Sequence, residues 1–367
     1  RAELLARLIN NNRGIAVAGT HGKTTTTSLI ASIMSHAQLD PTFINGGIIN
    51  SFNSNAQLGK GEYLIAEADE SDKSFLLLQP SISVITNIEP DHLINYEDNF
   101  DNLKNAFLEF IKKLPFNGIS IVCGDDPVIS ELKTSFQRSH ISYGFDPKND
   151  YVLSEYESDG RKSTFKITSN LNSIDITLNM LGRHNALNAA AAIVLCLLEN
   201  IPITVIKESL EGFMGIDRRM QILGEQVNEK SSKVYIDDYG HHPTEIQKTI
   251  EAIKNSYPEH NLTMVFQPHR YTRTKDLFNE FIQVLKDVDN LILLDVYPAG
   301  EKPIKGIDSS IIKKSLEDSG FSNVELVENK DLVLKRIADS PDINTVFVFQ
   351  GAGDISSISK QFERGHF

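Results

Sequence analysis

A short glycine loop between a predicted strand and a predicted helix constrains this chain more than any other feature. Residues 19–25 read Gly-Thr-His-Gly-Lys-Thr-Thr, after an apolar run at 14–18 and before a helical run at 28–37. In that context, backbone N–H groups and a helix N-terminus cradle phosphate, a lysine reaches the terminal phosphates, and a threonine hydroxyl binds Mg²⁺. The sequence therefore predicts that ATP or a similar nucleotide is bound by Gly19, Thr20, His21, Gly22, Lys23, Thr24 and Thr25.

The loop is shorter than the usual P-loop. Val17 stands where that motif has its first glycine. This spacing disfavours an ordinary P-loop kinase or GTPase, although a kinase stays open as an alternative. The non-functional alternative is a lysine beside a glycine turn, followed by an ordinary threonine-rich helical turn.

Composition narrows the class of protein. A chain of 367 residues is expected to form about two domains. Its net charge of −13 disfavours nonspecific binding to nucleic acid or to an anionic membrane surface. Cys123 and Cys196 lie far apart in apolar runs and are expected to be buried thiols. Without a membrane-length apolar run or a leader, we expect a cytoplasmic protein; the start at Arg1 leaves a fragment of a longer protein open.

Short apolar strands alternate with helical patterns along most of the chain. This alternation predicts parallel sheets covered by helices, with ligands beyond the carboxyl ends of the strands. Residues 151–181 alternate polar and apolar and predict a small antiparallel patch, followed by an apolar helix at 185–199. A helix end near Gly212 places the boundary between two domains, residues 1–214 and 215–367. Strands are expected at 63–66, 83–86 and 119–122 in the first domain, and at 234–236, 263–266, 291–294 and 345–349 in the second.

Candidate metal ligands follow two strands of the first domain. Glu67 opens the acidic run Glu-Ala-Asp-Glu-Ser-Asp at 67–72, and His92 closes Thr-Asn-Ile-Glu-Pro-Asp-His at 86–92. Acidic loops are often only solvated, and a lone histidine is often structural. A triphosphate needs Mg²⁺, however, and Mg²⁺ prefers hard oxygen ligands. We therefore favour Glu67 and His92 as metal ligands.

The motifs together resemble the Mur ligase family, and within it the ligases that join L-alanine to UDP-N-acetylmuramic acid. The resemblance covers nearly the whole chain. Besides the three motifs above, it rests on Gly-Arg-His-Asn at 182–185, Asp-Tyr-Gly-His-His-Pro-Thr at 238–244 and Phe-Gln-Pro-His-Arg at 266–270. It implies a central P-loop-type ATPase domain with a parallel sheet, then a Rossmann-like C-terminal α/β domain. By this resemblance, we expect the UDP-binding domain that precedes these in the family to be absent from this sequence, so that the chain alone would bind its UDP substrate poorly and be inactive without that domain.

The resemblance also implies roles for individual residues. Lys23 would contact the β- and γ-phosphates and Thr24 one Mg²⁺, while Glu67 and His92 would hold a second. Arg219, a better match than Arg218, would clamp the γ-phosphate and complete a catalytic set with Lys23, Glu67 and His92. No carbamylated lysine can be matched. The adenine contacts would be His184 and Asn188, and the muramyl and alanine contacts Tyr239, His241, Arg270 and Arg273.

The implied reaction is ATP-dependent amide formation through an acyl phosphate. Its substrates would be UDP-N-acetylmuramic acid and L-alanine, with ATP and Mg²⁺. That would place the chain in peptidoglycan biosynthesis, and so in cell wall biogenesis, cell shape, cell division and the cell cycle. A recycling ligase that adds a tripeptide is disfavoured by Thr20, where such enzymes typically carry Asn. A nonenzymatic nucleotide-binding module stays open, as does the choice between monomer and homodimer.

One further turn resembles a cofactor motif. Gly-Ala-Gly-Asp-Ile-Ser at 351–356 follows a strand but lacks the third glycine of a dinucleotide fingerprint. We interpret it as part of the fold rather than as a cofactor site.

Overall fold

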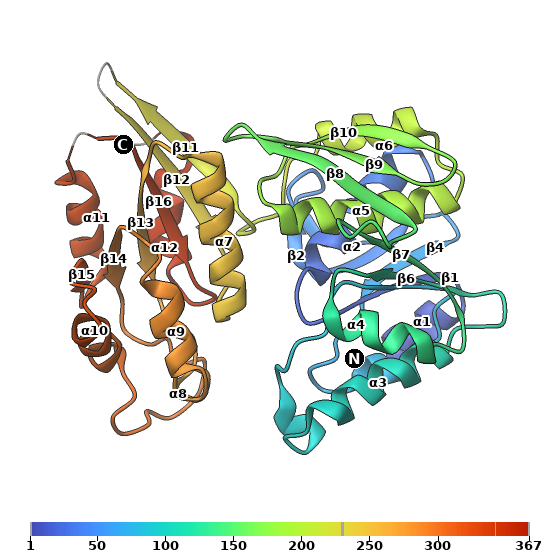
Figure 1. Ribbon diagram of the computed structural model, residues 1–367, viewed down its shortest axis with the longest axis horizontal. Helices are drawn as coiled ribbons and strands as arrows, with labels where there is room; N and C mark the ends of the chain where they lie inside the picture. The colour runs from blue at the N-terminus through green and yellow to red at the C-terminus, as the bar shows by residue number, and fades with distance from the viewer. Residues whose placement is uncertain (1, 229–230, 342, 366–367) are drawn as a thin grey trace. The chain divides into compact units, whose positions relative to one another are not determined.

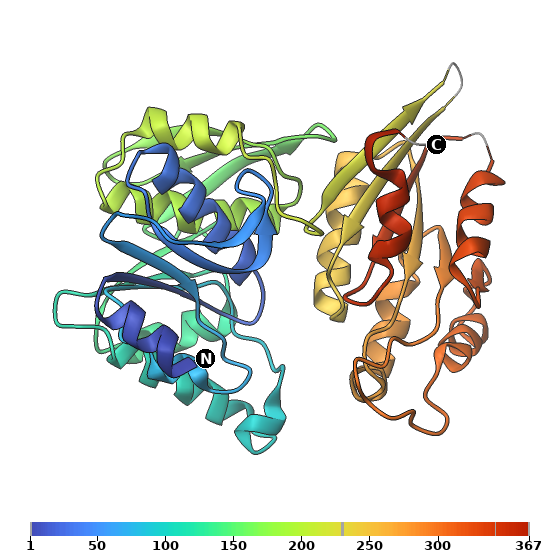
Figure 2. The same cartoon turned by 180° about the vertical axis from the view of Figure 1, so that it is seen from behind.

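The computed structural model describes residues 2–228, 231–341 and 343–365. The chain divides into two compact units, Arg1–Asp217 and Arg218–Phe367. They are coloured from blue to yellow-green and from yellow to red in Figures 1 and 2. This division falls a few residues after the boundary predicted from sequence.

The first unit is built on one ten-stranded sheet of order β10-β9-β8-β7-β6-β5-β1-β4-β2-β3. Strands β2, β4, β1, β5, β6 and β7 are paired in parallel. The predicted antiparallel patch is β8 to β10, and it extends the same sheet because β8 pairs with β7. The strands are β1 (Arg13–Ala18), β2 (Thr42–Ile49), β3 (Ser54–Gln57), β4 (Tyr63–Glu67), β5 (Ile82–Ile85), β6 (Ile119–Cys123), β7 (Ser139–Gly144), β8 (Tyr151–Ser158), β9 (Ser163–Thr168) and β10 (Ser173–Leu178).

Two buried helices support the glycine loop of this unit. Helix α2 (Lys23–His36) packs against α5 (Arg183–Leu198), whose alanines at 189–192 are fully buried. Small side chains allow the two helices to approach closely, which fixes the start of α2 against the core. The other helices are α1 (Ala2–Asn10), α3 (Phe100–Lys112), α4 (Pro127–Leu132) and α6 (Ile203–Glu211), with 3₁₀ turns at Ser74–Leu77, Leu93–Tyr96 and Lys133–Ser135.

The second unit contains a six-stranded sheet of order β11-β12-β16-β13-β14-β15. Only β11 is antiparallel to its neighbour. Helices α7 and α12 cover opposite faces of the sheet (Figures 1 and 2). The strands are β11 (Gln221–Val227), β12 (Ser232–Asp238), β13 (Asn261–Phe266), β14 (Asn290–Leu293), β15 (Val324–Leu326) and β16 (Thr345–Gln350). The helices are α7 (Pro243–Ser256), α8 (Tyr271–Asp276), α9 (Phe278–Leu285), α10 (Ser309–Asp318), α11 (Lys330–Ala338) and α12 (Ser356–Ser359), with a 3₁₀ turn at Lys360–Gly365.

The predicted fold class is confirmed: a P-loop-type parallel-sheet unit with antiparallel strands precedes a Rossmann-like unit. Both cysteines are free and buried, as predicted, and burial raises the pKa of the Cys123 thiol to about 12. Across the described residues, every helix is too short or too polar to cross a membrane.

Candidate functional site

The glycine loop joins β1 to α2 and needs glycine at two positions. Gly19 has φ 129° and Gly22 has φ 87°, a region that side chains other than glycine rarely adopt. A Cβ at Gly19 would collide with the hydroxyl of Thr86. One at Gly22 would lie 2.5 Å from Oδ1 of Asn188. Glycine is therefore needed at both positions for two reasons: the backbone turns tightly, and neighbouring side chains leave no room for a Cβ atom.

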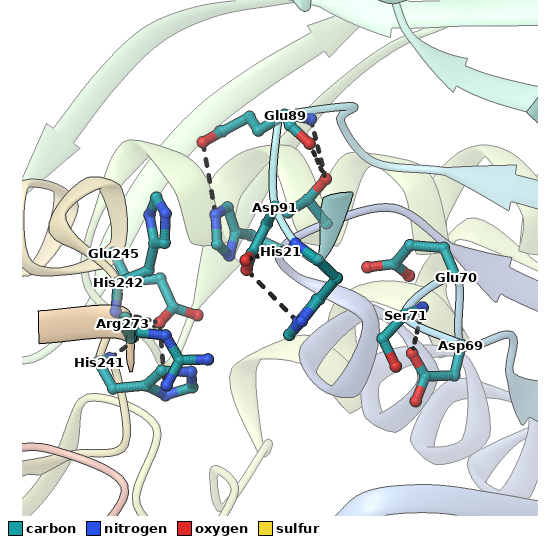
Figure 3. A network of polar contacts seen from close by, with 12 residues as sticks. His21, Asp69, Glu70, Ser71, Glu89, Asp91, His241, His242, Glu245 and Arg273 are labelled. Atoms are coloured by element: carbon teal, nitrogen blue, oxygen red, sulfur yellow. Dashed lines mark hydrogen bonds and ion pairs between the residues drawn. The ribbon is translucent and has the colours of Figure 1, made fainter. Parts of the chain in front are cut away.

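The segment after β5 holds the glycine loop in place. The Thr20 N–H donates to the Asn87 carbonyl at 3.1 Å, and the His21 N–H donates to Asn87 Oδ1 at 2.8 Å. The Asn87 amide group and the Thr86 hydroxyl both donate to the His21 carbonyl, at 2.9 and 2.5 Å. Figure 3 shows the His21 ring facing the Glu89 carboxylate, 3.4 Å away. The glycine loop at 19–25 and the motif at 86–92 are thus joined by hydrogen bonds, although they are far apart in the sequence.

Helix α2 presents a free N-terminal end to this loop. Its N-cap is Gly22 in the left-handed conformation, a residue that has no side chain with which to cap the helix. The first amides of an α-helix have no partner within the helix, and they lie at the positive end of its dipole. An anion at the start of α2 would accept hydrogen bonds from these amides, which is the arrangement that the sequence predicts for phosphate.

Lys23 is held inside the loop by four acceptors. Its ammonium donates to the carbonyls of Gly19 at 2.6 Å and Thr20 at 3.2 Å. It also contacts both carboxylate oxygens of Glu70, at 2.8 and 3.0 Å. Glu70 is only 2% exposed; burial raises the pKa of its carboxyl group, and Lys23 opposes that shift. Sequence reasoning placed Glu70 in an acidic run but did not assign it a role.

Thr24 and Glu67 converge at Gly46 in β2. The Gly46 N–H donates to Glu67 Oε1 at 2.6 Å. A Cβ at Gly46 would lie 3.0 Å from both carboxylate oxygens of Glu67 and 3.2 Å from the Thr24 hydroxyl. A carboxylate and a hydroxyl beside a phosphate loop form an oxygen donor set that fits Mg²⁺.

Among the described residues, the side chain of His92, the third predicted metal ligand, contacts Asp91 rather than Thr24 or Glu67. Its Nε2 lies 3.5 Å from Asp91 Oδ2, and its backbone is left-handed at φ 54°. It lies beyond the carboxyl end of β5, as expected from the sequence. Its joining Glu67 at a metal stays a prediction.

Replacement of Gly46 by alanine is expected to weaken metal use selectively. The φ angle of Gly46 is not positive, so the main effect of the added methyl group is to crowd Glu67 and Thr24. We expect the half-saturating Mg²⁺ concentration for ATP turnover to rise about tenfold, since disturbing a group that orients a metal ligand typically costs about 10- to 100-fold in metal affinity. Metal-free ADP binding should be unchanged. Gly212→Ala, at a helix end with φ −85°, is the control; equal Mg²⁺ dependence in both variants would contradict the assignment.

The predicted adenine contacts lie at the start of α5. Asn188 is buried; its Oδ1 accepts from the Thr26 hydroxyl at 3.4 Å, and its amide group donates to Asn185 Oδ1 at 3.3 Å. His184 is half-buried one turn earlier. Asn188 therefore buttresses the glycine loop. The adenine contacts of both residues stay predictions.

In the second unit, the predicted substrate residues gather at the ends of β12 and β13, which both pair with β16. The ring centroids of Tyr239 and His241 are 5.6 Å apart, as are those of His241 and His269. His269 stacks on Tyr297 at 5.5 Å, and Arg273 Nη1 lies 3.2 Å from His269 Nδ1. Figure 3 shows His241 and Arg273 of this group. His269 and Tyr297 were not selected from the sequence, although His269 lies in a quoted motif.

The arginines of the second unit differ in their surroundings. Arg270 is exposed, and its N–H donates to the Tyr297 carbonyl at 2.8 Å. The guanidinium groups of Arg218 and Arg219 lie 4.9 and 5.2 Å from the centroid of the Tyr239 ring. Arg218 also donates to the Gly351 carbonyl. The role of Arg219 at a γ-phosphate stays a prediction.

We expect two histidines to make the second unit sensitive to acid. Burial lowers the pKa of His241 and of His269 to about 4, and Arg273 adds to both shifts. The folded state thus binds fewer protons than the unfolded state between about pH 6.5 and 4, so stability should fall as pH falls through that window. The effect is at most about 1.4 kcal/mol per pH unit for each histidine. Hydrogen exchange of β12 and β13 should show it, and His269→Asn should reduce it more than the control His36→Asn.

Comparison with known families decides how this arrangement is classified. Residues 17–196 match the Mur ligase middle domain, and residues 218–353 match the Mur ligase glutamate ligase domain. The chain belongs to the Mur ligase family. Members of this family are ATP-dependent ligases that act on UDP-muramyl precursors of peptidoglycan. The predicted family is therefore confirmed.

Solved Mur ligase structures resemble the whole described fold. The UDP-N-acetylmuramate-alanine ligase MurC of Thermotoga maritima is 29% identical, with a TM-score of 0.81 over 98% of this chain and 76% of that chain. A murein peptide ligase of Psychrobacter arcticus is 22% identical, with a TM-score of 0.66 over 98% of this chain and 79% of its own. MurF of Thermotoga maritima, solved in complex with ADP, is 16% identical, with a TM-score of 0.75 over 99% and 83%. The last two likenesses concern the fold alone.

Proposed function

We propose that this Mur ligase joins L-alanine to the carboxylate of UDP-N-acetylmuramic acid with cleavage of ATP to ADP and phosphate. The observation that carries the proposal is the loop of α2, where Lys23, Thr24 and Glu67 surround a helix N-terminus suited to phosphate. The choice of L-alanine rests on the likeness to MurC and on Thr20.

The proposed chemistry has two steps. A carboxylate oxygen of the muramyl substrate attacks the γ-phosphorus of ATP, and ADP leaves. The alanine amine then attacks the carbonyl carbon of the acyl phosphate, phosphate leaves with the bond electrons, and the nitrogen loses a proton. Activation is needed because a carboxylate is a poor electrophile.

The chain's own residues would bind and orient the phosphates. The α2 amides and Lys23 would hold the β- and γ-phosphates, and Arg219 would meet charge that develops on the γ-phosphate. Mg²⁺ held by Thr24, Glu67 and His92 would neutralise phosphate oxygens. Tyr239, His241, Arg270 and Arg273 would line the site for the muramyl group and alanine, where arginines suit carboxylates and phosphates because they bind two oxygens at once.

Isotope transfer tests both the reaction and the acceptor. The chain is incubated with ATP, Mg²⁺ and UDP-N-acetylmuramic acid carrying ¹⁸O in its carboxylate, with L-alanine in one arm and the tripeptide in the other. We expect the alanyl amide by mass spectrometry and one ¹⁸O in the released phosphate. Faster turnover with the tripeptide would overturn the acceptor, in favour of a recycling ligase. ADP binding without amide in either arm, even when the family's UDP-binding domain is supplied in trans, would favour a nonenzymatic nucleotide-binding module.

A further inference from the structure

Glu70 is a buried acid beside the loop lysine. Its carboxylate contacts the Lys23 ammonium through both oxygens, at 2.8 and 3.0 Å, and the residue is 2% exposed. Lys23 itself is only 15% exposed in its side chain. Water therefore hydrates neither charge as it would on the protein surface. Each charge is stabilised mainly by its contact with the other.

The ammonium group has no spare donor in this arrangement. A lysine ammonium has three N–H donors. Here it faces four acceptor oxygens, which are the Gly19 carbonyl, the Thr20 carbonyl and the two oxygens of Glu70. A phosphate oxygen can receive an N–H from Lys23 only if one of these contacts is given up.

The framework around the pair is fixed. The Glu70 carbonyl accepts from the Tyr96 hydroxyl at 2.6 Å and from the Lys73 N–H at 3.1 Å. Tyr96 is fully buried. Lys23 is the first residue of α2, so its backbone is fixed as well. Because both backbones are fixed, the contact between the two charges can change only through the side chains of Lys23 and Glu70.

We propose that Glu70 is the resident counter-ion of Lys23, a positioning residue that holds the ammonium in the loop until nucleotide phosphate displaces it. The inference rests on the proposed function, in which this loop binds ATP. Glu70 thus opposes nucleotide binding, because it competes for the ammonium and places negative charge beside the phosphates. In return, it keeps the lysine in the loop between turnovers.

The variant Glu70→Gln separates charge from shape. Glutamine keeps an acceptor for Lys23 but removes the negative charge. We expect the dissociation constant for ADP, followed with a fluorescent ADP analogue, to fall about tenfold, since one buried charge interacts strongly at this range. KM for ATP should fall with it, and kcat should fall because product leaves more slowly. Asp72→Asn removes the same charge from an exposed position in the same segment and should bind ADP as the wild type does.

The outcomes are distinct. Equal or weaker ADP binding by folded Glu70→Gln would overturn the inference, while absence of ADP binding by the wild type would overturn the proposed function instead. If Glu70→Gln does not fold, a structure of the wild type with ADP decides. We expect the Lys23 ammonium to contact phosphate and to have lost at least one contact with Glu70. An ammonium that keeps all four contacts and does not reach phosphate would contradict the inference.

Discussion

Replacement of Lys23 by methionine is expected to abolish ADP formation. The side chain keeps its approximate length and apolar stem but loses the only charge that the loop places at the start of α2. Removing one preorganised donor from a developing anion typically lowers turnover about 100- to 1,000-fold, and a triphosphate carries more charge than most such anions. The measurement is ADP release in the presence of both substrates, and normal turnover by Lys23→Met would refute the site.

The same change should also destabilise the first unit, so the loss of activity needs a control for stability. Without Lys23, Glu70 is a buried acid with no counter-ion, and breaking a buried pair costs about 3–5 kcal/mol. The double variant Lys23→Met with Glu70→Gln removes the orphaned charge as well as its partner. We expect it to regain most of the free energy of unfolding, measured in urea, while remaining inactive. Recovery of activity together with stability would mean that Lys23 acts only through folding.

The central strands and helices could be predicted because they are apolar runs of the right length between glycine or proline signals. The strands β1, β4, β5 and β6 are buried along nearly their whole length and read plainly in the sequence. Strands β2, β3, β7, β11 and β15 were not predicted. β2 is interrupted by Gly46 and Gly47, and β11 is half-exposed, so neither has a clear hydrophobic period. Their positions depend on pairing partners that are distant in sequence.

The site was predicted in its elements but not in its contacts. Spacing identifies a phosphate loop and an acidic run at the end of β4, because both have local signatures. It does not tell which of four neighbouring carboxylates meets Lys23, since that depends on how the chain turns after the strand. The structure places Glu70 there and turns Glu67 toward Gly46. Likewise, the sequence does not show that Asn87 accepts a hydrogen bond from the glycine loop, because these residues become neighbours only when β1 pairs with β5.

Replacement of Asp238 by alanine is expected to destabilise the second unit strongly. This buried carboxylate, at the end of β12, accepts from the Met220 and Gly240 N–H groups, both at 2.9 Å, and from the Gln350 amide at 2.8 Å. The Thr249 hydroxyl adds a contact at 3.3 Å. Each donor left unpaired in the interior costs about 1–3 kcal/mol. We expect the free energy of unfolding of this unit to fall by about 3 kcal/mol or more in urea, because three N–H donors lose their acceptor.

The conservative variant tests whether hydrogen bonding or charge is responsible. Asp238→Asn keeps the shape and one acceptor oxygen, so it should lose less than Asp238→Ala. Burial raises the pKa of the Asp238 carboxyl group, while the charge of Arg219 and the three N–H donors oppose that shift. Asp276→Ala, at an exposed acid in α8, should unfold as the wild type does. Because Tyr239 and His241 lie within three residues of Asp238, the alanine variant should also raise KM for the muramyl substrate. Wild-type stability of Asp238→Ala would show that other contacts hold this end of β12.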